Sequence, residues 1–268
     1  MNANSAGTLT LGDFKVNRIG LGTNRITDTE AARAVLRRAA ELGINFIDTA
    51  DLYQKGQSEE TIARTFAPYP EGLLIATKGG MSWKDGSGIN DPKYLRDALD
   101  ASLMRLKREY VDLYQLHRVD PMVPIEQTAS VLKEMQDAGK VRYIGLSEVS
   151  VEQIEQFRKI IEIVSVQNQY NILERKYEAV LNYCEANGIV FIPWYPLAKA
   201  KLTNDAIERI AKKCEATPSQ IALAWLLRRS PMMLPIPGTL SVQHLEENIA
   251  ATNISLDESE MKELNSIT

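Results

Sequence analysis

The stretch GINFIDTADLY, residues 43–53, joins an apolar segment to a group of polar side chains. Residues 44–47 are typical of a buried strand, and Asp48, Thr49 and Tyr53 follow at its carboxyl end. Taken alone, the stretch also fits an ordinary strand and turn, because Asp and Thr are common where strands end. Its interpretation therefore depends on the segments before and after it.

The surrounding chain repeats a unit of one strand, one loop and one helix. We expect a short hairpin at residues 8–14, a first barrel strand at residues 16–22 and then a helix that stops at Gly43. Seven further strands, most of them followed by an amphipathic helix, are expected at residues 44–48, 73–77, 111–116, 141–147, 163–169, 189–194 and 232–236. The unit before the last strand carries an additional helix, at residues 219–230.

Eight alternating units with strands this apolar indicate a parallel sheet that is covered by helices. We therefore predict an α/β fold, a TIM (β/α)8 barrel with an N-terminal β-hairpin, in which residues 1–268 form a single domain because no linker-like stretch divides them. An open dinucleotide-binding sheet fits less well. Residues 20–25, GLGTNR, lack the third glycine of its fingerprint. Phosphate-loop, nucleophile-elbow and HExxH motifs are missing too, and we expect no metal site.

The composition of the chain argues against nucleic-acid and membrane partners. The 268 residues are 44% hydrophobic and carry a net charge of −4 without a basic cluster, so we expect no nucleic-acid partner. The first residues do not resemble a secretion signal, and no apolar run is long enough to predict a membrane helix. Cys184 and Cys214 stand far apart, as reduced thiols do. We expect a cytoplasmic protein with a small-molecule substrate. Its oligomeric state stays open.

Four polar residues follow three consecutive predicted strands. Asp48 and Tyr53 follow the second strand, Lys78 the third and His117 the fourth. In a barrel, the carboxyl ends of the strands meet at one face, so these side chains should share a pocket. Each residue alone is more often structural, as a surface lysine or a satisfied histidine. Their coincidence at adjacent strand ends predicts a catalytic site.

Together the four groups favour carbonyl reduction. A nearby ammonium lowers the pKa of a phenol, so Lys78 should help Tyr53 to give up its proton. Asp48 would keep Lys78 charged and in place, and His117 would hydrogen-bond the substrate oxygen. A carbonyl that is protonated by Tyr53 is ready to accept hydride. No side chain donates hydride, so a nicotinamide cofactor is implied.

These residues and their neighbours resemble the aldo-keto reductase family. The resemblance spans the chain through GINFIDTADLY, LLIATKGG, VDLYQLH, VRYIGLSEVS, VQNQYN, PWYPLAKA and LPIPGTLSVQHLEEN, and it is strongest for bacterial members of the pyridoxal-reductase type. It implies NADP(H)-dependent reduction of aldehydes and ketones to alcohols. It also implies a catalytic tetrad of Asp48, Tyr53, Lys78 and His117, with NADPH bound in an extended form without a Rossmann motif.

The resemblance also implies a set of cofactor contacts. Ser147 and Gln167 match positions that hold the carboxamide, Trp194 the residue that stacks on the nicotinamide, and Pro196 and Leu197 the pyrophosphate loop. The full set includes the pair expected at the adenine end and comprises Thr23, Asp48, Ser147, Glu148, Gln167, Trp194, Tyr195, Pro196, Leu197, Lys199, Lys201, Pro237, Gly238, Thr239, Gln243, Glu247 and Asn248.

Three positions depart from the family pattern. Glu148 replaces a frequent Asn near the carboxamide, while Gly238 and His244 replace a Lys and an Arg that grip the 2′-phosphate in many members. The loss of two cations weakens charge-assisted phosphate binding. Lys199 and Lys201 offer partial compensation, and backbone amides at the following helix N-terminus bind phosphate. We expect NADPH and leave NADH open.

Substrate contacts are expected in the loops that follow the strands, from Asn24, Tyr53, Trp83, His117 and Trp194. The loop at residues 81–91 is short, and no long loop follows Asn248, which favours an open pocket for a broad range of carbonyl compounds. Two other functions fit the same residues. One is a catalytically weak NADP(H)-binding sensor or regulatory subunit of this fold. The other is a Schiff-base lyase that uses Lys78.

Overall fold

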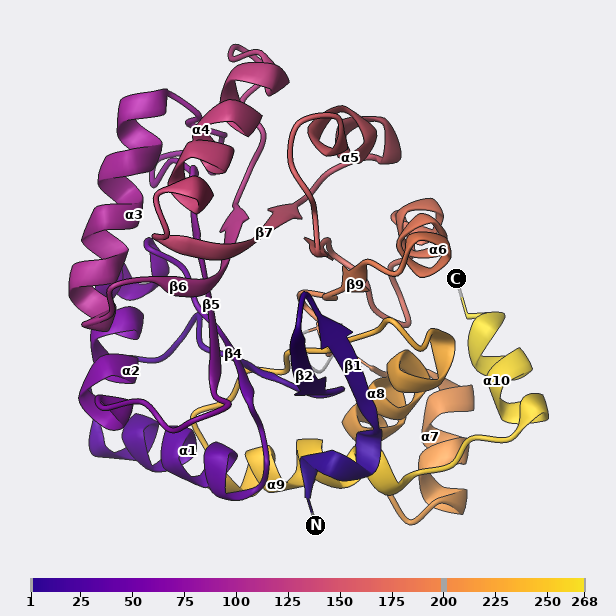
Figure 1. The fold of residues 1–268 in the computed structure, drawn as a ribbon. Coiled ribbons are helices and arrows are strands. Elements are labelled where there is room, and N and C mark those ends of the chain that lie inside the picture. The colour runs from indigo at the N-terminus through magenta and orange to yellow at the C-terminus, as the bar shows by residue number, and fades with distance from the viewer. Residues whose placement is uncertain (1, 199–201, 268) are drawn as a thin grey trace.

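Parallel strands form the wall of a barrel in the computed structural model, which describes residues 2–198 and 202–267. Each strand pairs with the next one along the chain, and the helices lie outside the ring (Figure 1). The strands are β3 (Leu21–Gly22), β4 (Phe46–Asp48), β5 (Leu74–Gly79), β6 (Val111–Leu116), β7 (Val141–Ser147), β8 (Ser165–Gln167) and β9 (Val190–Phe191). The predicted α/β barrel is confirmed.

The eighth position of the ring differs from the prediction, because residues 232–236 do not form a regular strand. This segment still closes the barrel. Phe191 exchanges backbone hydrogen bonds with Met232 and Leu234, both 2.9 Å, and the Gly20 amide donates to the Pro235 carbonyl at 2.9 Å. Prolines at residues 235 and 237 have no amide hydrogen and interrupt any regular ladder.

The N-terminal hairpin extends further than expected. It consists of β1 (Thr8–Leu11) and β2 (Phe14–Asn17), so part of the predicted first barrel strand belongs to the hairpin. Leu9, Leu11 and Val16 point into the barrel, where they pack on residues from the beginnings of the wall strands. Figure 1 shows the hairpin across the centre of the ring. It closes the barrel at the amino ends of the strands and leaves the other end open.

Ten α-helices surround the described part of the barrel, and most begin at a polar cap residue. Ser150, Thr217 and Asp257 form reciprocal capping boxes, as expected where helices must start sharply. None of the described helices is long and apolar enough to cross a membrane. They are α1 (Glu30–Glu41), α2 (Gln57–Phe66), α3 (Pro92–Leu106), α4 (Ile125–Asp137), α5 (Val151–Arg158), α6 (Glu178–Asn187), α7 (Asp205–Lys213), α8 (Pro218–Arg229), α9 (Val242–Ala250) and α10 (Glu258–Asn265).

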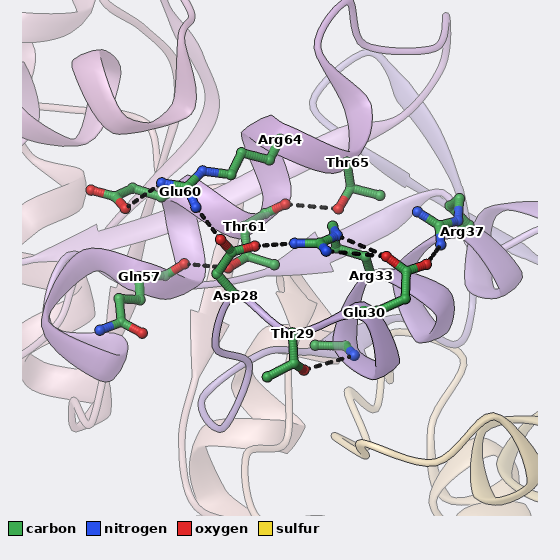
Figure 2. A network of polar contacts seen from close by, with 11 residues as sticks. Asp28, Thr29, Glu30, Arg33, Arg37, Gln57, Glu60, Thr61, Arg64 and Thr65 are labelled. Atoms are coloured by element: carbon green, nitrogen blue, oxygen red, sulfur yellow. Dashed lines mark hydrogen bonds and ion pairs between the residues drawn. The ribbon is translucent and has the colours of Figure 1, made fainter.

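A surface network of ion pairs joins α1 to α2 (Figure 2). The Asp28 carboxylate accepts from Arg33 of α1 and from Arg64 of α2, and Glu30 pairs with Arg33 and Arg37. These side chains remain partly exposed to solvent, so each pair adds about 1 kcal/mol or less. The stability of the barrel therefore depends mainly on its two apolar clusters, one between sheet and helices and one inside the ring.

Alternation along the strands divides the barrel interior into an apolar and a polar layer. Phe46, Leu74 and Leu113 point inward near the amino ends of their strands and join the inner cluster. Two or four residues later, the same faces of β4, β5 and β6 carry Asp48, Lys78 and Gln115, because side chains point to one face with a period of two. The polar layer lies at the open end and forms the floor of the site described next, where Gln167 of β8 joins it.

Gly12 in the hairpin turn provides a test of this packing. It has φ +62°, and a Cβ atom there would lie 2.2 Å from Cζ of Tyr143, which itself accepts a hydrogen bond from the Asp13 amide. We expect Gly12→Ala to lower the free energy of unfolding by about 2–4 kcal/mol, the sum of overpacking and left-handed strain.

Urea denaturation of both variants measures the difference. Gly139→Ala is the matched control, because Gly139 has φ +73° and, apart from its own chain neighbours, no described residue has an atom within 4 Å of where its Cβ would lie. Backbone strain alone should cost the control about 1 kcal/mol. Equal losses in the two variants would contradict close contact between the turn and Tyr143.

Candidate active site

A cavity of about 860 Å³ opens at the carboxyl ends of the barrel strands. It runs from the polar layer of the barrel to the first turns of α8 and α9, so segments from both halves of the chain line it. Most of the residues predicted from the sequence lie around it: Thr23, Asn24, Asp48, Tyr53, His117, Ser147, Gln167, Trp194, Tyr195, Pro196, Leu197, Pro237, Gly238, Thr239, Glu247 and Asn248.

Lys78 is fully buried beneath the cavity floor, and its ammonium group has three acceptors. Nζ donates to Oδ2 of Asp48 at 2.7 Å, to the Thr49 carbonyl at 2.7 Å and to the hydroxyl of Tyr53 at 3.2 Å. An ammonium has three hydrogens, so this arrangement satisfies all of them. Burial is the largest single effect and lowers the pKa of Lys78, but the charges and hydrogen bonds of Asp48 and Tyr53 together outweigh burial and raise this pKa. The predicted pairing of Asp48 with Lys78 is present in the structure.

The second oxygen of Asp48 is held by two amides. Gln167 donates to Oδ1 at 2.8 Å, and Gln115 donates to the same atom at 3.2 Å. Gln115 was not identified from the sequence, because it lies within an apolar strand rather than beyond its end. All three side chains are buried. Asp48 is thus fixed by an ion pair on one oxygen and by neutral donors on the other, which is what a buried carboxylate requires.

Tyr53 reaches the cavity from a tight turn after β4. Its amide donates to the Ala50 carbonyl, and the next two residues, Gln54 and Lys55, have positive φ values of 51° and 59°. The structure corrects the expected pKa of the phenol. Burial raises the pKa of Tyr53 by more than the Lys78 charge lowers it, so the hydroxyl stays protonated at neutral pH. Lys78 donates to that hydroxyl and leaves the phenolic hydrogen free to be donated elsewhere.

His117 lies beside Tyr53, with ring centroids 6.0 Å apart and the rings edge to face. Burial first, and then the charges of Lys78 and Arg118, hold the pKa of the imidazole well below 6.5. The ring is therefore neutral at physiological pH and carries one N–H. Nδ1 has no hydrogen-bond partner among the described residues, so nothing competes for that nitrogen.

We expected from the sequence that Glu148 contacts the cofactor, but its side chain does not line the cavity. Its Oε1 accepts from Nε1 of Trp194 and from the Gln169 amide, both at 2.7 Å, and its Oε2 accepts from the hydroxyl of Tyr177 at 3.0 Å. It adopts a positive φ of 57° that turns the side chain toward these donors. Glu148 therefore fixes the indole of Trp194 in the cavity wall.

Gly238 has a packing role at the opposite wall. A Cβ at Gly238 would lie 2.7 Å from the carbonyl oxygen of Gly22, and a Cβ at Gly22 would lie 2.7 Å from that of Ile236. The two segments meet backbone to backbone where the barrel closes, and this approach leaves no room for a longer residue such as lysine. Arg25 donates to the Gly238 carbonyl at 3.0 Å and thereby ties the loop after β3 to the same place.

Some predicted residues lie away from the cavity wall. Trp83 is 55% exposed and does not line the cavity, and Gln243 faces solvent, where it bonds Glu247. Lys199 and Lys201 lie outside the described residues. Conversely, the cavity has lining residues that were not predicted as contacts, namely Gly22, Arg25, Arg118, Thr217, Ser219, Ile236 and His244. Arg118 directly follows His117, and its position in the cavity is the one that strand-end reasoning could have identified.

Asp51 precedes Tyr53 by two residues in the same turn and has no role that the sequence revealed. Its Oδ1 and the hydroxyl of Tyr114 are both buried, and neither has a hydrogen-bond partner in the part of the chain that the structure describes. Burial, with a smaller contribution from the charge of Glu59, raises the pKa of Asp51 from 3.8 to about 7. The turn that carries Tyr53 therefore contains a carboxyl group that holds its proton into the neutral range.

This raised pKa predicts a pH-dependent stability. The native state binds the Asp51 proton up to a higher pH than the unfolded state does, so the free energy of unfolding falls as pH rises from about 4 to about 7. The Asp51→Asn variant has no carboxyl group to titrate at this position, so it should not lose this stability as the pH rises. We expect the free energy of unfolding of the variant to be about 1–3 kcal/mol higher than that of the wild type at pH 8, and the two values to be equal at about pH 4.

Denaturant unfolding at the two pH values tests this expectation. Asp100→Asn, at a solvent-exposed position on α3, controls for the removal of one negative charge. A gain in stability that is the same at both pH values would show that Asp51 is not the titrating group.

Comparisons with known proteins agree with this geometry. The model of the aldo/keto reductase family matches residues 16–268. An uncharacterized oxidoreductase of Schizosaccharomyces pombe is 45% identical over 96% of this chain and 88% of its own, and pyridoxine 4-dehydrogenase of Escherichia coli is 38% identical over 98% and 99%. The crystal structure of an aldo/keto reductase from Klebsiella pneumoniae with NADP and acetate matches with a TM-score of 0.83 and 28% identity, over 96% of this chain and 94% of that one. The chain therefore belongs to the aldo/keto reductase family.

Proposed function

We propose that this protein reduces aldehydes and ketones to alcohols with NADPH, with Tyr53 as the proton donor. The observation that carries the proposal is the arrangement of the three hydrogens of Lys78. One of them is directed to the Tyr53 hydroxyl, which therefore accepts from Lys78 and keeps its own hydrogen available. A phenol in this position can donate its proton to a substrate oxygen at the cavity floor.

The cavity fits an extended dinucleotide. Its volume of about 860 Å³ lies near the upper end for small-molecule sites. Ser147 and Gln167 offer polar groups for a carboxamide beside the catalytic groups, Trp194 offers an aromatic face, and the N-terminal end of α9, where Thr239 and His244 line the cavity, offers a site for phosphate. A bound nicotinamide would supply hydride to the substrate carbon. A similar reductase is known in complex with NADP, which supports this choice of cofactor.

The protein groups then act on the substrate oxygen. A neutral His117 donates one hydrogen bond to the carbonyl and leaves the proton transfer to Tyr53. As the carbon receives hydride, the oxygen becomes an alkoxide, which is far more basic than a phenolate, so the phenol gives up its proton despite its raised pKa. The adjacent Lys78 ammonium stabilises the phenolate that remains, and solvent protons restore the phenol.

Substitution of Tyr53 tests the role of the proton donor. We expect Tyr53→Phe to lower kcat by about 10²–10⁴-fold, because a positioned general acid contributes that much, while the affinity for NADPH changes little. NADPH oxidation with 4-nitrobenzaldehyde measures the first quantity, and quenching of protein fluorescence measures the second.

Tyr110→Phe is the control, since Tyr110 is 40% exposed and does not line the cavity. Unchanged turnover in Tyr53→Phe would exclude Tyr53 as the donor. A wild type that binds NADPH but turns over none of a panel of carbonyl compounds would instead support the sensor function. Borohydride trapping of a substrate adduct on Lys78 would support the lyase.

The ionisation states also predict the pH profile. The pKa of His117 lies well below 6.5, and the pKa of Tyr53 lies above its ordinary value of 10. We therefore expect kcat/KM for reduction to stay level from about pH 6 to about pH 9, since neither group changes its charge in that range. A decline centred near pH 6.5 would mean that His117 is an ordinary titrating histidine.

A further inference from the structure

We propose that Arg118 makes the catalytic cavity selective for carbonyl substrates that carry an oxyanion, a carboxylate or a phosphate, at a distance from the reacting carbon. This inference deepens the proposed function and rests on it. It concerns a residue that follows His117 in the chain and lines the cavity beside it.

The guanidinium of Arg118 is held from one side only. Its NH1 donates to the His117 carbonyl at 2.7 Å and to Oγ of Ser147 at 3.2 Å. Both acceptors are neutral. They fix the plane of the guanidinium against the wall formed by the ends of β6 and β7 and leave NH2 and Nε without a hydrogen bond among the described residues.

These remaining donors are accessible. Arg118 is only partly buried, and neither Nε nor NH2 is among the buried polar atoms of the described chain that lack a partner. Because Arg118 lines the cavity, its free N–H groups offer a planar fork to whatever enters. Such a fork matches carboxylate and phosphate oxygens in two parallel hydrogen bonds.

The charge of Arg118 is not compensated by the protein. Among residues 2–198 and 202–267, no carboxylate lies within 4.0 Å of its guanidinium, whereas Lys78 on the same floor is paired with Asp48. The catalytic end of the cavity therefore carries about one net positive charge. Its charge also acts on the reacting groups, since Arg118 contributes to the lowered pKa of His117 and offsets a small part of the rise in the pKa of Tyr53 that burial causes.

The cofactor does not account for this cation. The groups that we assign to its pyrophosphate, Pro196 and Leu197, follow β9, while Arg118 follows β6 and contacts His117, which we assign to the substrate oxygen. A nicotinamide ring is cationic before it accepts hydride and uncharged afterwards, and its carboxamide, which we assign to Ser147 beside Arg118, is neutral in both forms, so neither supplies an anion to Arg118. The anion that would satisfy the fork must therefore belong to the substrate.

Matched pairs of neutral and anionic substrates test the inference. Wild type, Arg118→Gln and Arg118→Lys are compared on 4-carboxybenzaldehyde against its methyl ester, and on glyceraldehyde 3-phosphate against glyceraldehyde, with NADPH. The ratio of kcat/KM between the acid and its neutral partner removes effects on the common chemistry. We expect Arg118→Gln to lower this ratio by about 10- to 100-fold for at least one pair, with smaller losses in Arg118→Lys.

Which pair responds distinguishes a carboxylate from a phosphate substrate. Arg209→Gln, a surface cation paired with Glu263, controls for the overall loss of positive charge and should leave both ratios as they are. An unchanged ratio for both pairs in Arg118→Gln, with wild-type turnover of the neutral partners, would overturn the inference and leave the proposed function intact.

If the wild type shows no turnover, a binding measurement still tests the role of Arg118 separately from the proposed function. If the wild type reduces neither member of any pair, the proposed function fails. The inference is then judged on the affinity for 4-(hydroxymethyl)benzoate, measured by calorimetry in the presence of NADP⁺. Arg118→Gln should weaken this affinity at least 10-fold relative to that for the methyl ester, and equal affinities in wild type and variant would overturn the inference.

Discussion

The buried ammonium of Lys78 is the constraint on which the site depends. Its three hydrogens bind a carboxylate, a carbonyl and a phenol, and all three acceptors come from the stretch between Asp48 and Tyr53. Such a charge is tolerated inside a barrel only if every hydrogen has an acceptor, so the strand end, the turn and the Tyr53 hydroxyl are held in one arrangement. The fold of the turn thus also fixes the position of the Tyr53 hydroxyl.

Much of this site could be predicted because barrel strands alternate with a period of two. Asp48, Lys78 and His117 end apolar strands, and that position brings them to one face regardless of other detail. Gln115 and Arg118 escaped notice for opposite reasons. Gln115 lies inside an apolar strand, where a single amide is easily read as an exception, and Arg118 follows a more conspicuous histidine. Only the contacts at Asp48 and Ser147 reveal what they do.

Other features could not be predicted, because they depend on the balance of opposing effects or on backbone proximity. Lys78 beside Tyr53 suggested that the pKa of the phenol is lowered. The phenol is buried so deeply that its pKa is raised instead, and the sequence does not show how deeply a side chain is buried. Residues 232–236 look like a strand, yet their prolines leave a partial ladder. From the sequence, Gly238 stood out only because it replaces a lysine that is frequent in the family. The structure shows that the carbonyl of Gly22 occupies the space that any side chain at position 238 would need.

The contact between Gly22 and Gly238 has a consequence for the order in which the molecule is made. The cavity wall beside it combines the third strand of the chain with a segment that follows α8, so neither half contains a complete groove. During synthesis, a ribosome-bound chain that has not yet released residues 232–238 keeps the barrel open along one seam, with the Gly20 amide still lacking the Pro235 carbonyl as its acceptor. The groove that would hold the cofactor therefore forms only after residues 232–238 have joined the barrel.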